Sequence, residues 1–337
     1  MKKLFLAIIA FQFSVFSSQL MAETISATDS RVTFVGRSVV EDGSYRFDWP
    51  STYFRVAFTG KSLSMRVSDS KRNFYAVWVD SPTSAAPTRI VEVKGNDTII
   101  DLVLAADVKK SKIKEHQVVI QKRTEAGCGT TTIHEFMTDG KFVQAAPLKE
   151  RQIEFIGDSY TCGYGVDAPS RYDKFSDETE NASRTYASIV SRYFDADYFT
   201  IAHSGRGICR NAGSNIPWEL MPDLYQYTID RDSTTLWSVS QSKFCPDLTV
   251  IYLGANDFSG WMMPDNKKFN KGYLHLLSEI KANYGEEHPI LCMTPGPYEF
   301  LFLYVRDVVN NCGMKNVYFL GHCPMIHNET NEDLGAG

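Results

Sequence analysis

The sequence has 337 residues, of which 43% are hydrophobic and 22% are charged, a composition typical of a globular protein with a large buried core. The formal net charge of -5 and the pI near 5.8 provide no overall attraction for nucleic acid or for anionic membranes. At this length we expect about two domains.

The first 22 residues have the layout of a secretory signal peptide. Lys2 and Lys3 precede an apolar stretch from Leu4 to Phe16, and a short polar segment then leads to Ala22. The apolar stretch is too short to span a bilayer comfortably, and no other stretch approaches the roughly 20 apolar residues that a transmembrane helix needs. We therefore expect a secreted or periplasmic protein without a membrane span, whose mature chain starts near Glu23.

Short runs of alternating apolar and polar residues fill the segment 31–122. Turn residues separate several of them, at Asp42-Gly43, Gly60-Lys61 and Gly95-Asn96-Asp97. Apolar residues at every second position, with no convincing helical pattern, predict an all-β sandwich or jelly roll, which we place at residues 23–147. The runs are RVTFVG, YRFDW, FRVAFTG, LSMRVSD, FYAVWVD and HQVVIQK.

The pattern changes after Pro147, so we place a domain boundary at about residues 145–149. Longer segments then separate the strand-like runs, and two of these segments, 186–194 and 273–280, have the apolar spacing of a helix. Alternating strands and helices predict an α/β domain with a parallel sheet covered on both faces, at residues 148–337. The expected strands are 153–156, 198–202, 248–253, 290–293 and 317–320.

Polar, glycine-bearing turns follow the first three of these strands, at the edge where open α/β sheets bind ligands. They contain Gly157-Asp158-Ser159, HSGRGICRN and LGANDF. Acyl transfer needs a nucleophilic hydroxyl and donors for the developing oxyanion. Ser159 can supply the hydroxyl, while its own N–H, the N–H of Gly205 and the Asn256 amide can supply the donors. Taken singly, Gly205 is equally typical of a turn and Asn256-Asp257 of a helix cap.

Segments of both predicted domains resemble known families. Gly157-Asp158-Ser159, the glycine of SGRG and Gly254-Ala255-Asn256-Asp257 resemble the first three conserved blocks of the SGNH, or GDSL, hydrolases. More closely, several segments resemble carbohydrate esterase family two, and they cover nearly the whole mature chain. These segments are RVTFVGR, DGSYRFDWP, FTGKSLSMRV, VVIQKRTEA, IEFIGDSYTCGYG and SGRGICRN.

The resemblance implies a jelly roll followed by a flavodoxin-like SGNH hydrolase domain that removes acetyl groups from polysaccharides such as xylan or mannan. It makes Ser159 the nucleophile, and it makes Gly205 and Asn256 the partners of the Ser159 N–H in the oxyanion hole. Gly207 is the alternative to Gly205. The expected partner is an acetylated polysaccharide or oligosaccharide, and we expect no cofactor and no metal. Seven scattered cysteines form neither a disulfide framework nor a zinc site, although one pair could be oxidised.

The base of the triad is the point where the sequence departs from the family pattern. In the family a histidine after the last strand activates the serine, often before a proline and two or three residues after an acid. His322 and His327 lie in that region but not in that context, and the segment after Leu320 has no helical period. We therefore expect the hydrolase domain to stop short of its histidine and final helix. His134 and His203 do not resemble substitute bases.

Two aromatic residues, Tyr164 and Trp261, could stack on sugar rings or equally belong to the core. Two other functions are compatible with the sequence. The first is an esterase or lipase with another substrate, because the SGNH blocks alone do not specify the acyl chain. The second is carbohydrate binding by a protein with a vestigial esterase domain. Nothing in the sequence indicates the oligomeric state.

Overall fold

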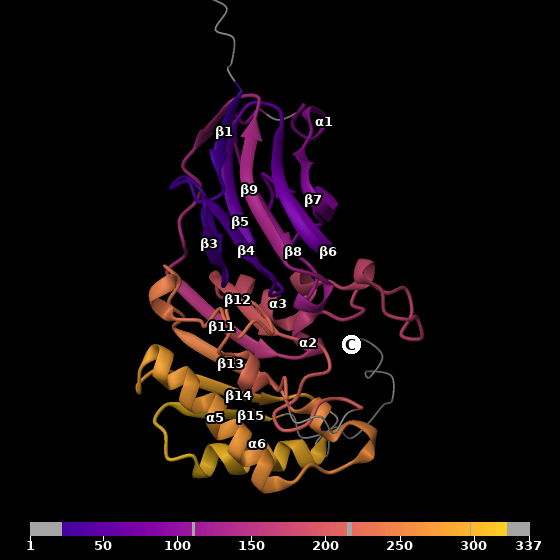
Figure 1. Cartoon of the computed structure of the whole chain (residues 1–337), viewed down its shortest axis with the longest axis vertical. Helices are drawn as coiled ribbons and strands as arrows, with labels where there is room; N and C mark the ends of the chain where they lie inside the picture. Colours follow the sequence, from indigo (N-terminus) through magenta and orange to yellow (C-terminus); the bar gives the residue numbers. More distant parts are fainter. Residues whose placement is uncertain (1–21, 110–111, 214–217, 297, 322–337) are drawn as a thin grey trace, which may run out of the picture.

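The structure is a computed structural model that describes residues 22–109, 112–213, 218–296 and 298–321 (Figure 1). An antiparallel sheet of ten strands forms the N-terminal part, and a parallel sheet of five strands follows it. This arrangement confirms the predicted fold class. Residues 1–21 of the predicted signal peptide lie outside the described residues. No helix within the described part of the chain is long and apolar enough to cross a membrane.

The N-terminal sheet is curled, with the central path β10-β5-β8-β6-β9-β4-β3. Its residues alternate as predicted: in β6, buried Leu63, Met65 and Val67 alternate with half-buried neighbours and point into the core of this sheet. The strands are β1 (Glu23–Ser26), β2 (Thr33–Val35), β3 (Val39–Glu41), β4 (Ser44–Phe47), β5 (Tyr53–Thr59), β6 (Leu63–Val79), β7 (Arg89–Val103), β8 (Glu115–Lys122), β9 (Thr131–Thr138) and β10 (Lys141–Val143). Two short helices, α1 (Ala105–Val108) and η1 (Ala126–Cys128), interrupt them.

Strands β6 and β7 are longer than the sequence pattern indicates. The runs LSMRVSD and FYAVWVD belong to one strand, β6, which pairs with β7 through register shifts on either side of Asp69. The turn predicted at Gly95-Asn96-Asp97 is wrong, because these residues lie within β7. Gly95 and Asp97 have positive φ angles of 81° and 55°, so they bend the strand without ending it.

The second sheet has the strand order β12-β11-β13-β14-β15 with all pairs parallel. The five predicted strands are all present, and the predicted helices correspond to α3 and α5. The strands are β11 (Arg151–Gly157), β12 (Ala196–Ala202), β13 (Leu248–Tyr252), β14 (Ile290–Thr294) and β15 (Val317–Gly321). The helices are α2 (Ser159–Cys162), α3 (Tyr186–Tyr193), α4 (Met221–Leu224), α5 (Asn266–Tyr284) and α6 (Glu299–Asn311), with the 3-10 turns η2 (Asp177–Thr179), η3 (Ala182–Arg184), η4 (Val239–Gln241) and η5 (Ala255–Trp261).

Helices pack on both faces of the parallel sheet. On one face Phe155 of β11 contacts the ring of Tyr186 in α3, while on the other Ile156 shares a core with α5 and α6. The edge strand β15 packs against α6 through Phe319, whose ring lies 5.0 Å from that of Phe302. Successive residues of β11 therefore point to opposite covered faces, which explains why all of its residues from Ile153 to Gly157 are buried.

The two sheets share one core at their junction. Val35, Trp49 and Tyr53 of the N-terminal part are buried in the same cluster as Ile201 and Tyr225 of the second part. The indole N–H of Trp49 also donates to the Thr228 carbonyl at 2.9 Å. Figure 1 shows β12 and β11 as the strands of the parallel sheet that lie nearest the N-terminal sheet. The N-terminal sheet is therefore packed firmly against the edge of the parallel sheet.

Candidate active site

Ser159 is the first residue of α2, immediately after β11. Asp158 caps this short helix by accepting a hydrogen bond from the Tyr160 N–H at 3.1 Å. Gly157 allows the tight turn, since a Cβ there would lie 1.8 Å from Thr161 Oγ1. Ser159 is half-buried, and within the described residues its hydroxyl makes no hydrogen bond. The hydroxyl is therefore held at the end of a buried strand and remains accessible.

The loop after β12 carries the two candidate glycines. Gly207 N–H donates to Asn211 Oδ1 at 3.1 Å, whereas Gly205 N–H has no hydrogen-bond acceptor among the described residues. Gly205 has a φ of 80°, a conformation that glycine adopts easily. Of the two glycines, Gly205 is thus the one whose N–H is available to an incoming oxygen.

Asn256 connects all three strand ends. Its side-chain Nδ2 donates to Asp158 Oδ2 at 3.0 Å and to the Arg206 carbonyl at 2.9 Å. The Asn256 amide therefore holds together Asp158, which precedes Ser159, and Arg206, which follows Gly205. Both amide protons of Asn256 are engaged, so donation to an oxyanion requires one of these bonds to be shared or replaced.

Asp158, which accepts a hydrogen bond from the Asn256 amide, is fully buried. Burial raises the pKa of its carboxyl to about 7, and the charge of the nearby Asp257 adds to the increase. The hydrogen bond from the Tyr160 N–H acts in the opposite direction. Asp158 therefore belongs to the support of the nucleophile helix, because it has no exposed surface through which to meet a substrate.

Asp257 organises the loop that follows β12, a role that the sequence did not reveal. Its carboxylate accepts the backbone N–H groups of Ile208, Cys209 and Arg210 at 2.8–3.0 Å. A Cβ at Gly207 would lie 2.5 Å from Asp257 Oδ2, so glycine is needed for this close approach. The alternative that Asn256-Asp257 caps a helix is wrong, because both residues lie within η5, whose N-cap is Gly254, and Asp257 instead accepts N–H groups of the loop after β12. In the sequence, only the position of Asp257 beside Asn256 at a strand end could have indicated this role.

The five histidines that the structure describes have partners away from Ser159. His203 Nδ1 pairs with Asp230 at 3.0 Å in a buried site, and His134 contacts Ser44 and Ser68. His116 pairs with Asp80, His275 with Glu279, and His288 with Thr249. His322 and His327, the candidates for the base, lie outside the described residues.

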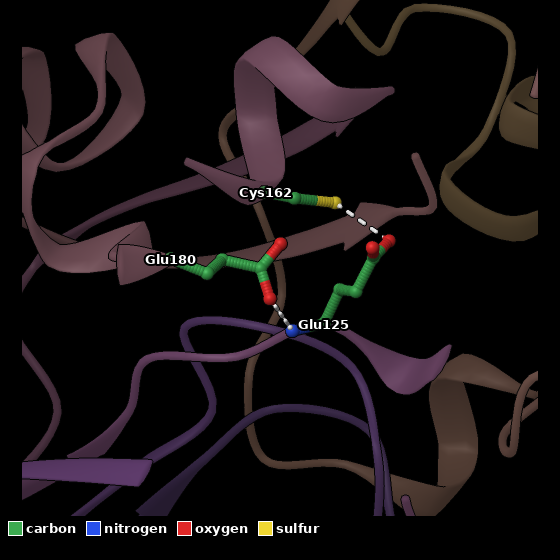
Figure 2. A group of neighbouring side chains, drawn as sticks. All are labelled: Glu125, Cys162 and Glu180. Atoms are coloured by element: carbon green, nitrogen blue, oxygen red, sulfur yellow. Dashed lines mark hydrogen bonds between the residues drawn. The ribbon is translucent and has the colours of Figure 1, made fainter. Parts of the chain in front are cut away.

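A second cluster lies beside α2. Donor atoms of Glu125, Cys162 and Glu180 lie within 4.8 Å of one another, and all three residues are buried (Figure 2). These atoms could hold a cation. Burial, followed by the charge of Glu125, raises the pKa of Glu180 to about 8, and burial raises the pKa of the Cys162 thiol well above its usual range. Within the cluster Glu180 Oε2 accepts the Glu125 N–H at 2.8 Å, and Cys162 Sγ lies 3.5 Å from Glu125 Oε2, so the three residues form a hydrogen-bonded cluster.

Tyr164 is half-exposed and stacks on Phe175 with ring centroids 4.1 Å apart, in the loop after α2. It is therefore a surface residue in the folded chain, as stacking on a sugar would require. The side chain of Trp261 lies outside the described part of the structure.

Two family models match the chain. Residues 34–147 match the model described as carbohydrate esterase 2 N-terminal, and residues 155–311 match the GDSL-like lipase/acylhydrolase family. An acetylxylan esterase/glucomannan deacetylase of Cellvibrio japonicus is 31% identical over 280 residues, which cover 80% of this chain and 73% of the relative. The cellulase/esterase CelE of Acetivibrio thermocellus is 34% identical over 282 residues, or 81% of this chain, and the chain spans 33% of that relative's length.

Solved structures show the same two-part fold. A family two carbohydrate esterase from Clostridium thermocellum in complex with cellohexaose has a TM-score of 0.78 and 31% identity, and the match covers 86% of this chain and 88% of the other. A family two carbohydrate esterase from Cellvibrio japonicus has a TM-score of 0.80 at 23% identity, over 93% and 92% of the two chains. At 23% identity, the match to the Cellvibrio japonicus structure shows a similar fold.

Proposed function

Because the chain belongs to carbohydrate esterase family two, we propose that it removes O-acetyl groups from polysaccharides such as xylan or mannan through a serine nucleophile. The observation that carries this proposal is the meeting of three strand ends at one edge of the parallel sheet. Ser159 follows β11, Gly205 follows β12 and Asn256 follows β13, and the Asn256 amide joins them.

In the proposed reaction the Ser159 hydroxyl attacks the acetyl carbonyl. The carbonyl oxygen becomes an oxyanion that the N–H groups of Ser159 and Gly205 and the amide of Asn256 stabilise. The bond from the acetyl carbon to the sugar oxygen then breaks, and the sugar leaves as an alcohol with the proton that the base took from Ser159. In a second step water, deprotonated by the same base, attacks the acetyl-serine, acetate leaves and the proton returns to Ser159. This role for Gly205 is supported by its N–H, which has no acceptor in the part of the chain that the structure describes, whereas the Gly207 N–H is already bonded to Asn211.

The reaction also needs a base to take the serine proton. The described histidines are engaged with other side chains, so His322 and His327 are the candidates within this sequence. Single alanine substitutions would test them: loss of acetate release in one variant would identify the base, and full activity in both would exclude these two residues.

The test of the activity is acetate release from acetylated xylan and acetylated glucomannan, beside hydrolysis of 4-nitrophenyl acetate and 4-nitrophenyl esters of longer acids. We expect a preference for the acetyl group and for the polysaccharides. A preference for long acyl chains would instead support the esterase or lipase alternative. Binding of a polysaccharide by folded protein without any acetate release would support a binding function and contradict the proposal.

Export is a further part of the proposal. The layout of residues 1–22 supports cleavage by a signal peptidase near Ala22. Expression of the whole chain in a bacterial host, followed by N-terminal sequencing of periplasmic and medium fractions, would test it. A protein retained in the cytoplasm with Met1 intact would contradict export.

A further inference from the structure

We propose that Glu125, which belongs to the N-terminal part of the chain, is a positioning residue for acyl transfer in the neighbouring hydrolase part. This inference rests on the proposed function of Ser159 and Gly205. It assigns the N-terminal part a direct role in the shape of the oxyanion hole, through one buried carboxylate.

One oxygen of Glu125 joins the two segments that carry the candidate catalytic groups. Oε2 accepts the backbone N–H of Ser204 at 2.6 Å and lies 3.5 Å from Cys162 Sγ (Figure 2). Ser204 immediately precedes Gly205, and Cys162 lies three residues after Ser159 in α2. A single carboxylate oxygen therefore fixes the oxyanion loop relative to the nucleophile helix.

Glu125 is itself held in place by several buried groups. Its backbone N–H donates to Glu180 Oε2 at 2.8 Å, and its carbonyl accepts from Lys122 Nζ at 3.0 Å. Lys122 is fully buried and also bonds the Thr124 carbonyl at 2.6 Å. Glu125 is 7% exposed, so its side chain has little freedom to leave its acceptor position. The 2.6 Å distance from the Ser204 N–H to Glu125 Oε2 is short for a hydrogen bond from a backbone N–H, as expected for an acceptor held in this way.

The position of the oxyanion donor matters for the transition state more than for substrate binding. A displacement of about 1 Å at a catalytic group can lower the rate by about 10²-fold. The Ser204 N–H is bonded to Glu125, while the next N–H, that of Gly205, has no acceptor within the described ranges. Removing the carboxylate frees the Ser204 N–H and lets the loop shift away from Ser159. The expected signature is therefore a fall in kcat with little change in KM.

The kinetic test compares Glu125→Ala, Glu125→Gln and Glu92→Ala with the parent protein on a chromogenic acetate. Glu125→Ala should lower kcat by about 10–100-fold and change KM by less than about threefold. Glu125→Gln keeps an oxygen that can accept the Ser204 N–H, so it should recover kcat to within about tenfold of the parent. Glu92 is a control from the same N-terminal part of the chain, where it lies in β7 and pairs with Arg72 at the surface.

Hydrogen exchange at the Ser204 amide provides a measurement that does not need catalysis. Exchange of this amide should be faster in Glu125→Ala and unchanged in Ser159→Ala and Glu92→Ala, because only the first variant removes its acceptor. Slow exchange of Ser204 in folded Glu125→Ala would overturn the inference. So would a kcat equal to that of the parent in the folded variant, since Glu125 would then act on stability alone.

The two proposals can fail separately. If the parent protein hydrolyses acetates and Ser159→Ala abolishes this, an unaffected Glu125→Ala contradicts only the role of Glu125. If the parent has no Ser159-dependent activity, the proposed function fails and the positioning role falls with it, even where Ser204 exchange shows the contact. Stoichiometric zinc in the purified protein, with activity sensitive to a chelator, would show that Glu125 is a metal ligand and would also contradict the inference.

Discussion

Replacing Arg37 by alanine would remove the buried cation that joins the two sheets. The fully buried guanidinium donates to Glu154 Oε1 at 3.0 Å and lies over the rings of Tyr225 and Trp237, at 4.5 and 4.8 Å. Glu154 is also fully buried in β11, and its other hydrogen bonds come from neutral hydroxyl groups. Within the described residues, Arg37 is the one cation that forms an ion pair with this carboxylate.

The expected loss of stability follows from leaving Glu154 without its partner. Removing one member of a buried ion pair costs about 3–5 kcal/mol, because the remaining charge is uncompensated. The entropy of unfolding is about 2.1 cal/mol/K per residue, or about 0.7 kcal/mol/K for a chain of 337 residues, so Tm should fall by roughly 4–7 °C. This is a large part of the roughly 5–15 kcal/mol by which folded proteins are stable.

The loss should also grow with pH. Burial raises the pKa of Glu154 and Arg37 opposes this, so the pKa rises further in Arg37→Ala. The folded variant then holds a proton that the unfolded chain has released. Its free energy of unfolding therefore decreases as pH rises above the ordinary carboxyl pKa, and the difference from the parent should be larger at about pH 8 than at about pH 5.

Thermal and urea unfolding followed by circular dichroism would measure both effects. Arg66→Ala is the matched control, because Arg66 pairs with Asp97 at the surface and such pairs contribute about 0–1 kcal/mol. Adding Glu154→Gln to Arg37→Ala should restore part of the lost stability and remove its pH dependence. A loss for Arg37→Ala no larger than that of Arg66→Ala, or one that does not change with pH, would refute the reasoning.

Three further predictions concern the site and acid stability. Ser159→Ala should lower acetate release by up to about six orders of magnitude, as for catalytic residues that act as a unit, and near-normal turnover by the folded variant would exclude the mechanism. Asn256→Ala should lower kcat by about 10²–10³ with a smaller change in KM, whereas a rise in KM alone would make it a binding residue. The pKa of His288 is lowered to about 4, mainly by burial. Between about pH 6.5 and pH 4 the unfolded chain therefore binds more protons than the folded one. The free energy of unfolding falls on acidification through this range, by up to about 3 kcal/mol. His288→Gln should reduce this fall in pH-dependent urea unfolding while His275→Gln, at the surface, should not, and equal behaviour of the two variants would contradict the assignment.

Much of the parallel sheet could be predicted because its signals are local. Each of its strands is a short apolar run, and α3 and α5 repeat apolar residues with the period of a helix, so neighbouring residues define these elements. The same holds for Ser159, since a buried strand leads directly into its glycine-bearing turn. Strand ends in a parallel sheet converge, which allowed Gly205 and Asn256 to be placed with it.

The residues that support the site depend on contacts between distant parts of the chain. Glu125 bonds Ser204, 79 residues away, and Arg37 bonds Glu154, 117 residues away. A single sequence shows such residues only as isolated charges, which are most often found at the surface. The difference between the Gly205 and Gly207 N–H groups also required the structure, because only the structure shows that Asn211 Oδ1 accepts the Gly207 N–H.

The core shared by the two sheets limits how this chain can exchange parts with its relatives. Val35, Trp49 and Tyr53 fill the same interior as Ile201 and Tyr225, so a chimera joined near residue 147 would combine surfaces that were not shaped for each other. Such a hybrid would leave gaps or collisions at the junction unless the facing residues were transferred with it. Arg37 and Glu154 would have to move as a pair, and so would Glu125 with the loop that carries Ser204. Recombination within the family is therefore expected to preserve both parts together.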